Sequence, residues 1–226
     1  MIQGRQRHSA TFINSTARYA LGGWVSSMGI TLTNVEQYSA IKNKWTTVGQ
    51  LTQCVQCAGC VAYKSSIYLF GGNDENRSTD KDEYLDCIQQ YDTTTQQSTM
   101  LPLRLPCRSL LHAVLWAKSV ILADRSTCLV FDLNQQTLEQ RNQFAVGVSH
   151  FGLVVDNQTL FVIGGGNIQT DRNGATTWTC TDEVKCIPVM DIINNELTVK
   201  WTRHTKLQSP QLVQAFAQLT LPTVQA

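Results

Sequence analysis

Apolar residues along this chain come in short runs separated by polar turns, and the same arrangement occurs four times. The four stretches are residues 8–23, 57–72, 109–124 and 150–165. Each contains an apolar run, a short polar turn, a second apolar run and then a Gly-Gly pair or its remnant. Neither run follows a 3.6-residue period, so each stretch predicts a β-hairpin. Recurrence at this spacing is typical of repeat architectures.

The glycine pairs stand at one register of the repeat. They are Gly22-Gly23, Gly71-Gly72 and Gly164-Gly165, and Ala123-Asp124 takes their place in the third stretch. Glycine adopts positive φ and allows another backbone to approach closely. We therefore expect the same bend after the second strand of each repeat, with Asp124 tolerating an unusual φ in the third.

Two more strands are predicted in each repeat. The third has an apolar residue three positions before Tyr, Phe or Met, and these positions are Tyr38-Ser39, Tyr91-Asp92, Phe131-Asp132 and Met190-Asp191. The fourth strand is expected to begin at Trp45, Ser98, Leu138 and Trp201. Four antiparallel strands per unit, repeated four times, predict an all-β fold of the β-propeller type.

The Gly-Gly after the second strand, the Tyr-Asp-like pair on the third and the Trp opening the fourth resemble the kelch repeat. The resemblance implies four-stranded blades at about residues 5–52, 53–105, 106–145 and 146–207. It also implies that the first strand of each blade lines the central axis. The corresponding column is Ala10, Gly59, Leu111 and Gly152, and three of these four residues are small.

Four blades are fewer than kelch rings usually contain. Residues 211–221 alternate apolar and polar positions and predict one further strand, of the kind that closes the ring in BTB–kelch proteins. The first repeat already has its own inner strand. We therefore expect an incomplete ring, from a larger protein whose upstream blades and BTB and BACK regions are not in this sequence.

Composition narrows the function classes. Of 226 residues, 42% are hydrophobic and 15% charged, which favours a folded core over disorder. The formal net charge of +1 argues against broad nucleic-acid binding. No stretch has the roughly 20 apolar residues that span a membrane, and the first residues lack an apolar signal region. We expect a cytoplasmic protein with cysteines present as thiols.

The cysteines contain one spacing that resembles a metal site, Cys54-x-x-Cys57-x-x-Cys60. Zinc sites usually combine two such pairs, or one pair with distant histidines. Residues three apart on a strand point to opposite faces, so buried thiols are the better interpretation. Cys180 and Cys186 are expected in a loop. We expect no metal and no cofactor.

An enzyme is the alternative of a different class. Propeller oxidases of the galactose oxidase type contain kelch repeats and use Tyr, His and Cys around copper. Those residue types occur here, but no spacing singles out a set. Two of the four histidines, His8 and His150, share one column with Cys57, which indicates a structural role. We therefore predict no catalytic residues.

The loops between the second and third strands differ most between repeats, and loops carry recognition in such scaffolds. The loop from Asn73 to Asp86 has six acidic and two basic residues. A partner protein is expected to contact this loop and nearby positions. The predicted contact residues are Asp74, Glu75, Arg77, Asp80, Lys81, Asp82, Glu83, Arg104, Arg108, Asp171 and Arg172.

The resemblance is greatest to the C-terminal kelch domain of BTB–kelch proteins. It implies a non-catalytic propeller that recognises substrates for a cullin-RING ubiquitin ligase. Binding of actin or another cytoskeletal protein is a second possibility within the same class, and the copper oxidase is the third. In the first two cases the partner is a protein or peptide, with no role for nucleic acid or membrane.

Overall fold

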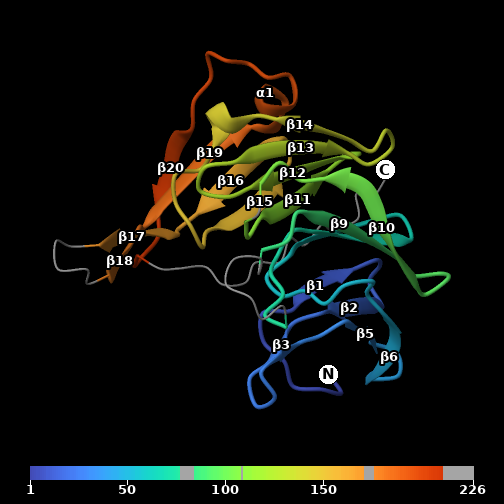
Figure 1. Cartoon of the computed structure of the whole chain (residues 1–226). Coiled ribbons are helices and arrows are strands. Elements are labelled where there is room, and N and C mark those ends of the chain that lie inside the picture. The colour runs from blue at the N-terminus through green and yellow to red at the C-terminus, as the bar shows by residue number, and fades with distance from the viewer. Residues whose placement is uncertain (77–83, 108, 171–175, 211–226) are drawn as a thin grey trace.

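The computed structural model of the chain describes residues 1–76, 84–107, 109–170 and 176–210, and their regular structure is mainly β (Figure 1). Four antiparallel four-stranded sheets follow one another along the chain. Within each sheet the strands lie side by side in chain order. The prediction of an all-β fold built from four-stranded units is confirmed.

The strands of the four blades are as follows. Blade 1 contains β1 (Ser9–Phe12), β2 (Ala17–Leu21), β5 (Asn34–Ser39) and β6 (Lys44–Gln50). Blade 2 contains β7 (Gly59–Tyr63), β8 (Ser66–Phe70), β9 (Cys87–Asp92) and β10 (Gln97–Arg104). Blade 3 contains β11 (His112–Trp116), β12 (Ser119–Ala123), β13 (Cys128–Asp132) and β14 (Thr137–Gln140). Blade 4 contains β15 (Gly152–Asp156), β16 (Thr159–Ile163), β19 (Glu183–Pro188) and β20 (Thr202–Lys206).

Two small hairpins are inserted between second and third strands. One pairs β3 (Trp24–Val25) with β4 (Ile30–Thr31) in blade 1. The other pairs β17 (Gly166–Thr170) with β18 (Thr176–Cys180) in blade 4. The helical elements are the 3-10 turn η1 (Asn142–Phe144) and the short helix α1 (Val189–Ile193).

The first strands of the blades form an inner row, with β1 beside β7, β7 beside β11 and β11 beside β15. Crowding in this row is visible at Gly59. A Cβ added there would lie 2.7 Å from the backbone oxygen of Leu111 and 3.0 Å from the Cβ of Ala113 in the next blade. A small residue is therefore required where two inner strands meet.

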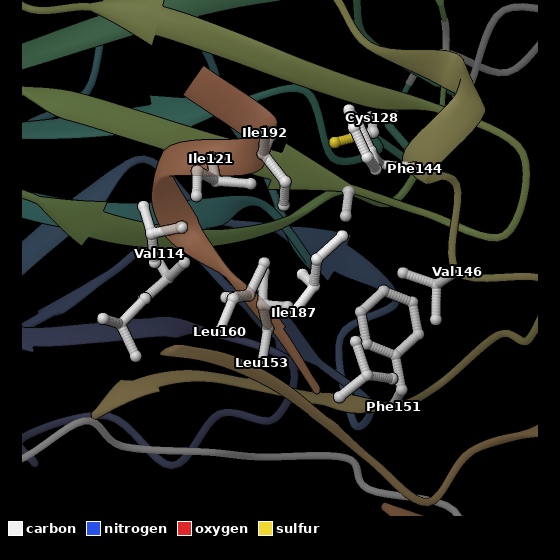
Figure 2. Packing of buried hydrophobic residues seen from close by; sticks show 14 of the residues in the cluster. Val114, Ile121, Cys128, Phe144, Val146, Phe151, Leu153, Leu160, Ile187 and Ile192 are labelled. Carbon is white, nitrogen blue, oxygen red and sulfur yellow. The ribbon is translucent and has the colours of Figure 1, made fainter. Parts of the chain in front are cut away.

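Apolar side chains fill the space between successive blades. Figure 2 shows the layer between blades 3 and 4, where Val114 and Ile121 of one blade face Leu153 and Leu160 of the next, and Phe144 lies beside Cys128. Phe144, on η1 between the two blades, is fully buried. Equivalent clusters fill the junctions between blades 1 and 2 and between blades 2 and 3. Each blade thus buries its sheet faces against its neighbours, as repeat architectures do.

The predicted column of inner-strand residues, Ala10, Gly59, Leu111 and Gly152, is wrong by one residue in two repeats. Ser9 pairs with Leu21, just as Gly59 pairs with Phe70 and Gly152 with Ile163, so Ser9 and not Ala10 is the equivalent position. The turn of blade 1 is one residue longer, closing from Ile13 to Ala17. In blade 3 the equivalent residue is His112 rather than Leu111, because it pairs with Ala123.

The predicted third strand of the fourth repeat is wrong at its end. Met190 and Asp191 lie in α1, after β19 has finished at Pro188. Ile187 pairs with Leu160 in blade 4, and Tyr91 pairs with Ile67 in blade 2. Ile187 is therefore the blade 4 equivalent of Tyr91. The helix occupies the long connection to β20, and Trp201 lies just before that strand instead of opening it.

The third repeat also differs from the prediction after its second strand. Ala123 ends β12, so Asp124 and Arg125 occupy the place of the glycine pair. Asp124 does not have a positive φ. Its carboxylate instead accepts hydrogen bonds from the backbone N–H groups of Ser126 and Thr127, at 2.7 and 2.6 Å. This tight turn makes the glycine bend unnecessary. The strand predicted over residues 211–221 lies outside the described residues.

Candidate protein-binding face

The two ends of the blades carry different kinds of chain segment. One end has the entries into the first strands (residues 5–8, 53–58, 105–107 with 109–111, and 141–151) and the described parts of the connections between second and third strands (residues 22–33, 71–76 with 84–86, 124–127, and 164–170 with 176–182). We call it the connection face. The opposite end, the turn face, has the tight turns within the hairpins and α1. In Figure 1, β3 and the β17–β18 hairpin lie on the same side of the molecule.

The glycine pairs bring each connection against an entry segment. Gly22 and Gly23 have φ of 61° and 98°, and Gly71 and Gly72 have 61° and 89°. A Cβ on Gly22 would lie 2.2 Å from the oxygen of Val55, at the entry to the next blade. A Cβ on Gly72 would lie 2.6 Å from the oxygen of Gln56, at the entry of its own blade. Only glycine fits both the conformation and the space.

The residue after each pair makes a two-way backbone bridge to the entry of the same blade. Trp24 bridges to Gln6, and Asn73 bridges to Gln56, each through two N–H···O bonds of 2.8 to 2.9 Å. In blade 4, Gly166 bridges to Ser149 in the same way, at 2.9 Å in both directions. The bend at Gly164-Gly165, with φ of 63° and 99°, makes this possible.

The connections of blades 1 and 2 are joined to each other. The Asn76 side chain accepts from the Thr31 N–H at 2.9 Å and donates to the Thr31 oxygen at 2.8 Å, as a neighbouring strand would. Beside this contact, Arg7 and Glu75 form an ion pair at 3.3 Å, with side chains 52% and 29% exposed. The Arg7 guanidinium also lies 5.8 Å from the ring of Trp24.

The predicted acidic loop is partly engaged in internal contacts. Asp74 is only 3% exposed and accepts a hydrogen bond from the Asn76 N–H. Glu75 is paired with Arg7, and Asp86 with Arg104 at 3.3 Å. Arg104 at 58% side-chain exposure is accessible to a partner. The remaining predicted contact residues lie outside the described residues: Arg77, Asp80, Lys81, Asp82, Glu83, Arg108, Asp171 and Arg172.

The blade 4 hairpin presents an aromatic side chain. Trp178, at the centre of β18, is 43% exposed. Its ring meets that of His150 edge-on, with 5.0 Å between centroids. His150 lies at the entry to blade 4 and has a φ of 54°.

The structure places Cys180 on β18 of this hairpin and Cys186 on β19, which corrects the expectation that both lie in a loop.

Buried polar atoms without a hydrogen-bond partner are concentrated on the connection face. Among the described residues they belong to five side chains, His8, Trp24, Gln56, Asn73 and His150. All five stand at a blade entry or next to a glycine pair. Gln56, at 1% exposure, leaves both its amide oxygen and its amide nitrogen unpaired. Folded proteins satisfy nearly all such atoms with protein groups or ordered water, so the blade entries are where buried water would complete the hydrogen bonding.

The repeated acidic residue after the aromatic position has a structural function on the turn face. Asp92 accepts from the N–H groups of Thr94 and Thr95, at 2.7 and 3.0 Å. Asp132 does the same with Asn134 and Gln135, both at 2.8 Å. These backbone hydrogen bonds lower the pKa of both carboxyl groups. The Asp residues close the turn into the fourth strand.

The aromatic residues predicted on the third strands lie there in blades 1 to 3, whereas Met190 of blade 4 lies in α1. Tyr38 pairs directly with Trp45, with 5.3 Å between ring centroids. Tyr91 is buried, and its hydroxyl donates to the oxygen of Val48 in blade 1 at 2.8 Å. Phe131 is fully buried between blades 2 and 3. Trp201 donates from Nε1 to the Phe144 oxygen at 3.0 Å.

The cysteine and histidine side chains do not converge in the part of the chain that the structure describes. No three His, Cys, Asp or Glu side chains there could hold one metal ion. Burial raises the pKa of the Cys60 thiol to about 12. His8 is not the equivalent of His150, since Arg7 and Cys57 share the left-handed conformation of His150 at 57° and 55°. The column of His8, Cys57 and His150 is therefore wrong by one residue in the first repeat.

Sequence inspection missed two features of this face. The β17–β18 hairpin was hidden because its Gly, Asn and Thr residues are common in loops. The stretch from Gly166 to Cys180 does contain alternating Ile, Trp and Thr positions that could have indicated strands. The unpartnered polar atoms depend on three-dimensional packing. The sequence of one repeat does not show which of its polar side chains will lack a hydrogen-bond partner after folding.

Comparisons with known proteins agree with the architecture. Residues 55–102 match the family described as Kelch motif. The solved structure of YjhT superposes with a TM-score of 0.74 at 14% sequence identity, over 92% of this chain and 72% of that chain. At this identity the likeness concerns the fold. The chain carries a kelch motif and folds as a kelch-type β-propeller.

Proposed function

We propose that this chain is a non-catalytic, protein-binding propeller whose connection face captures a partner protein. The observation that carries the proposal is that the connections between second and third strands differ between blades and present large exposed side chains on this face, namely Met28, Tyr84 and Trp178. A partner that covers these side chains buries apolar surface that the free protein exposes to water.

The finer proposal is that the partner is a substrate of a cullin-RING ubiquitin ligase, and that the chain is the recognition part of a BTB–kelch adaptor. The resemblance of the repeats to BTB–kelch proteins supports it. The proposal places the protein in the cytoplasm, in keeping with eight free cysteines. No helix among the described residues has the length and apolar character of a membrane span.

The test compares two double variants in affinity purification from cells. A connection-face variant replaces Tyr84, which is 44% exposed, with Ala and Glu75 with Arg. A turn-face variant replaces Ile41 and Leu197, which are 83% and 72% exposed, with Ala. We expect the connection-face variant to lose most of the proteins that wild type enriches, while the turn-face variant keeps them. The opposite pattern, or equal retention by both, would reject the connection face as the binding site.

The same purification separates the finer possibilities. Ligase adaptor function predicts enriched proteins whose ubiquitination falls when the connection-face variant replaces wild type in the full-length protein. Co-sedimentation of the purified chain with actin filaments, with no such effect on ubiquitination, would favour cytoskeletal binding instead. Turnover of a primary alcohol by a copper-loaded chain would contradict the non-catalytic assignment.

A further inference from the structure

The β17–β18 hairpin has an unpaired edge with no protection against strand pairing. Within the described residues, β18 is hydrogen-bonded to β17 on one side only. Thr176 to Thr179 are all exposed. A free edge directs alternate N–H and C=O groups outward, where another strand can pair with them. Figure 1 shows the hairpin extending from blade 4 beside the ends of β19 and β20.

The outer edges of the four blades are different. The edge strand β6 begins with Lys44, and β10 contains Pro102, Arg104 and a register shift between Met100 and Arg104. The strand β14 has four residues including Glu139, and β20 contains Arg203 and Lys206. Charge, proline, irregular pairing and short length all discourage edge pairing. No charged residue or proline occurs in β17, in β18 or at Thr181.

We propose that β18 is a docking strand, which pairs with an extended, uncharged peptide segment of the partner protein. The inference rests on the proposed function and names the chemistry of its partner. Strand addition provides affinity through main-chain hydrogen bonds, and pockets for alternate side chains provide specificity. Trp178 supplies the side-chain anchor, because aromatic residues that are partly exposed and held in position dominate small interfaces.

The anchor is held in position by blade 4 itself. The Trp178 ring packs edge-on against His150, 5.0 Å between centroids, and the backbone bridge of Ser149 with Gly166 fixes the base of the hairpin. Thr176 and Cys180 lie on the same side of β18 as Trp178, because side chains alternate along a strand. The peptide residue beside Trp178 is therefore apolar, with small or hydroxyl-bearing residues at the two alternate positions next to it.

The size of the edge favours a peptide over a second copy of the chain. Five strand residues extend over roughly 17 Å. Pairing two such edges buries far less than the roughly 1,200 Å² at the lower limit of stable protein interfaces. A short linear segment binds usefully through an edge of this length, and its continuity with the connection face lets the rest of the partner use the blade entries.

The test uses a library of short random linear peptides displayed on phage and selected on the whole chain. We expect enriched peptides with an uncharged core, which bind wild type with an affinity little changed between low and high salt. Trp178→Ala should weaken binding about tenfold or more. The double variant Thr177→Lys/Thr179→Lys should weaken it as well. Ile41→Ala, an exposed apolar side chain on the turn face, is the control and should bind like wild type.

Each other outcome rejects the inference. Enriched peptides that bind Trp178→Ala and the double-lysine variant normally would show that they dock elsewhere; if those peptides lose binding to the Tyr84→Ala/Glu75→Arg variant, the proposed function stands without β18. Failure to enrich any peptide would also overturn the docking strand. Concentration-dependent dimerisation of wild type, abolished in Trp178→Ala, would reassign the edge to self-pairing. Urea unfolding of each variant, unchanged from wild type, shows that the loss is local.

Discussion

Both faces of the propeller place residues with side chains in the left-handed conformation, among them Arg7, Cys57 and His150 at the blade entries of the connection face, but the connection face also has glycine pairs. On the turn face these residues include Lys64, Ala117, Gln136 and Asn157, with φ between 53° and 55°. At the glycine pairs of the connection face, a Cβ would collide with an entry segment. The difference teaches that crowding, and not φ alone, requires glycine on the connection face.

The ion pairs of the two faces also differ in burial. The Arg5–Glu36 ion pair is fully buried beside the blade 1 connection, where Arg5 also donates to the oxygens of Gly22 and Asn34 at 2.9 and 3.0 Å. The Lys118–Asp132 pair on the turn face is exposed on the lysine side, at 53%. The connection face is thus fixed by buried, geometrically specific contacts, whereas the turn face is closed by local turns.

The largest expected effect comes from breaking the buried ion pair. Arg5→Met leaves the Glu36 carboxylate buried without its partner, which costs about 3–5 kcal/mol in the free energy of unfolding. Lys118→Met on the turn face should cost at most about 1 kcal/mol, because exposed pairs contribute little. Urea unfolding of both variants measures the difference. Equal losses would contradict the assignment of Arg5 as the anchor of the connection.

A smaller effect is expected from Gly22→Ala. The left-handed conformation costs about 1–2 kcal/mol for a residue with a Cβ, and the contact at 2.2 Å from the Val55 oxygen adds about 1–3 kcal/mol of overpacking. Gly29→Ala is the matched control, since its φ is 62° and nothing lies within 4 Å of the added Cβ. Gly29→Ala should lower the free energy of unfolding only by the cost of the left-handed conformation, about 1–2 kcal/mol. If the two variants unfold at the same urea concentration, crowding is not the reason for the glycine.

The smallest effect concerns pH. His112 begins the inner strand of blade 3 and packs against the Phe151 ring, 4.3 Å between centroids. Burial, with a contribution from His150, lowers the pKa of His112 from 6.5 to about 4. Between pH 6.5 and about 4, the unfolded chain therefore binds a proton at His112 that the folded chain does not bind. Stability contributed by neutral His112 is complete above about pH 6.5 and is lost as the pH falls towards 4.

The variant His112→Gln should reduce this decline in stability between neutral and acidic pH. Urea unfolding at several pH values measures it, with His204→Gln on the exposed strand β20 as the matched control. A decline as steep in His112→Gln as in wild type would show that other groups cause it.

The comparison of faces also explains what the sequence could predict. The hairpins and glycine pairs were predictable because strand alternation and left-handed bends constrain residue type locally. The offsets at Ser9 and His112 were not. In blade 1 a turn one residue longer, from Ile13 to Ala17, changes the register without changing the pattern. In blade 3 the second strand includes Ala123, which has no glycine after it to mark its end. Asp191 was misplaced because Met190-Asp191 copies the Tyr-Asp pattern while Pro188 ends the strand and α1 follows.

The candidate site was less predictable than the fold. The acidic composition of residues 73–86 drew attention to the connection face, but Asp74 is buried and Glu75 and Asp86 are paired with arginines. Charge counts do not report which carboxylates are already engaged. Unpaired atoms such as those of Gln56 arise from packing between distant segments and have no local signature. The free edge of β18 follows from the hairpin itself, once residues 166–180 are recognised as two strands.

Amide hydrogen exchange on the chain, free and with a protein that it captures from cells, tests the central claim most directly. We predict slower exchange at the blade entries around residues 53–58 and 145–151 and in β18, with the turns around residues 64–65 and 117–118 unchanged. Protection confined to the turn face and α1, with the blade entries exchanging as in the free chain, would contradict the assignment of the connection face as the binding surface.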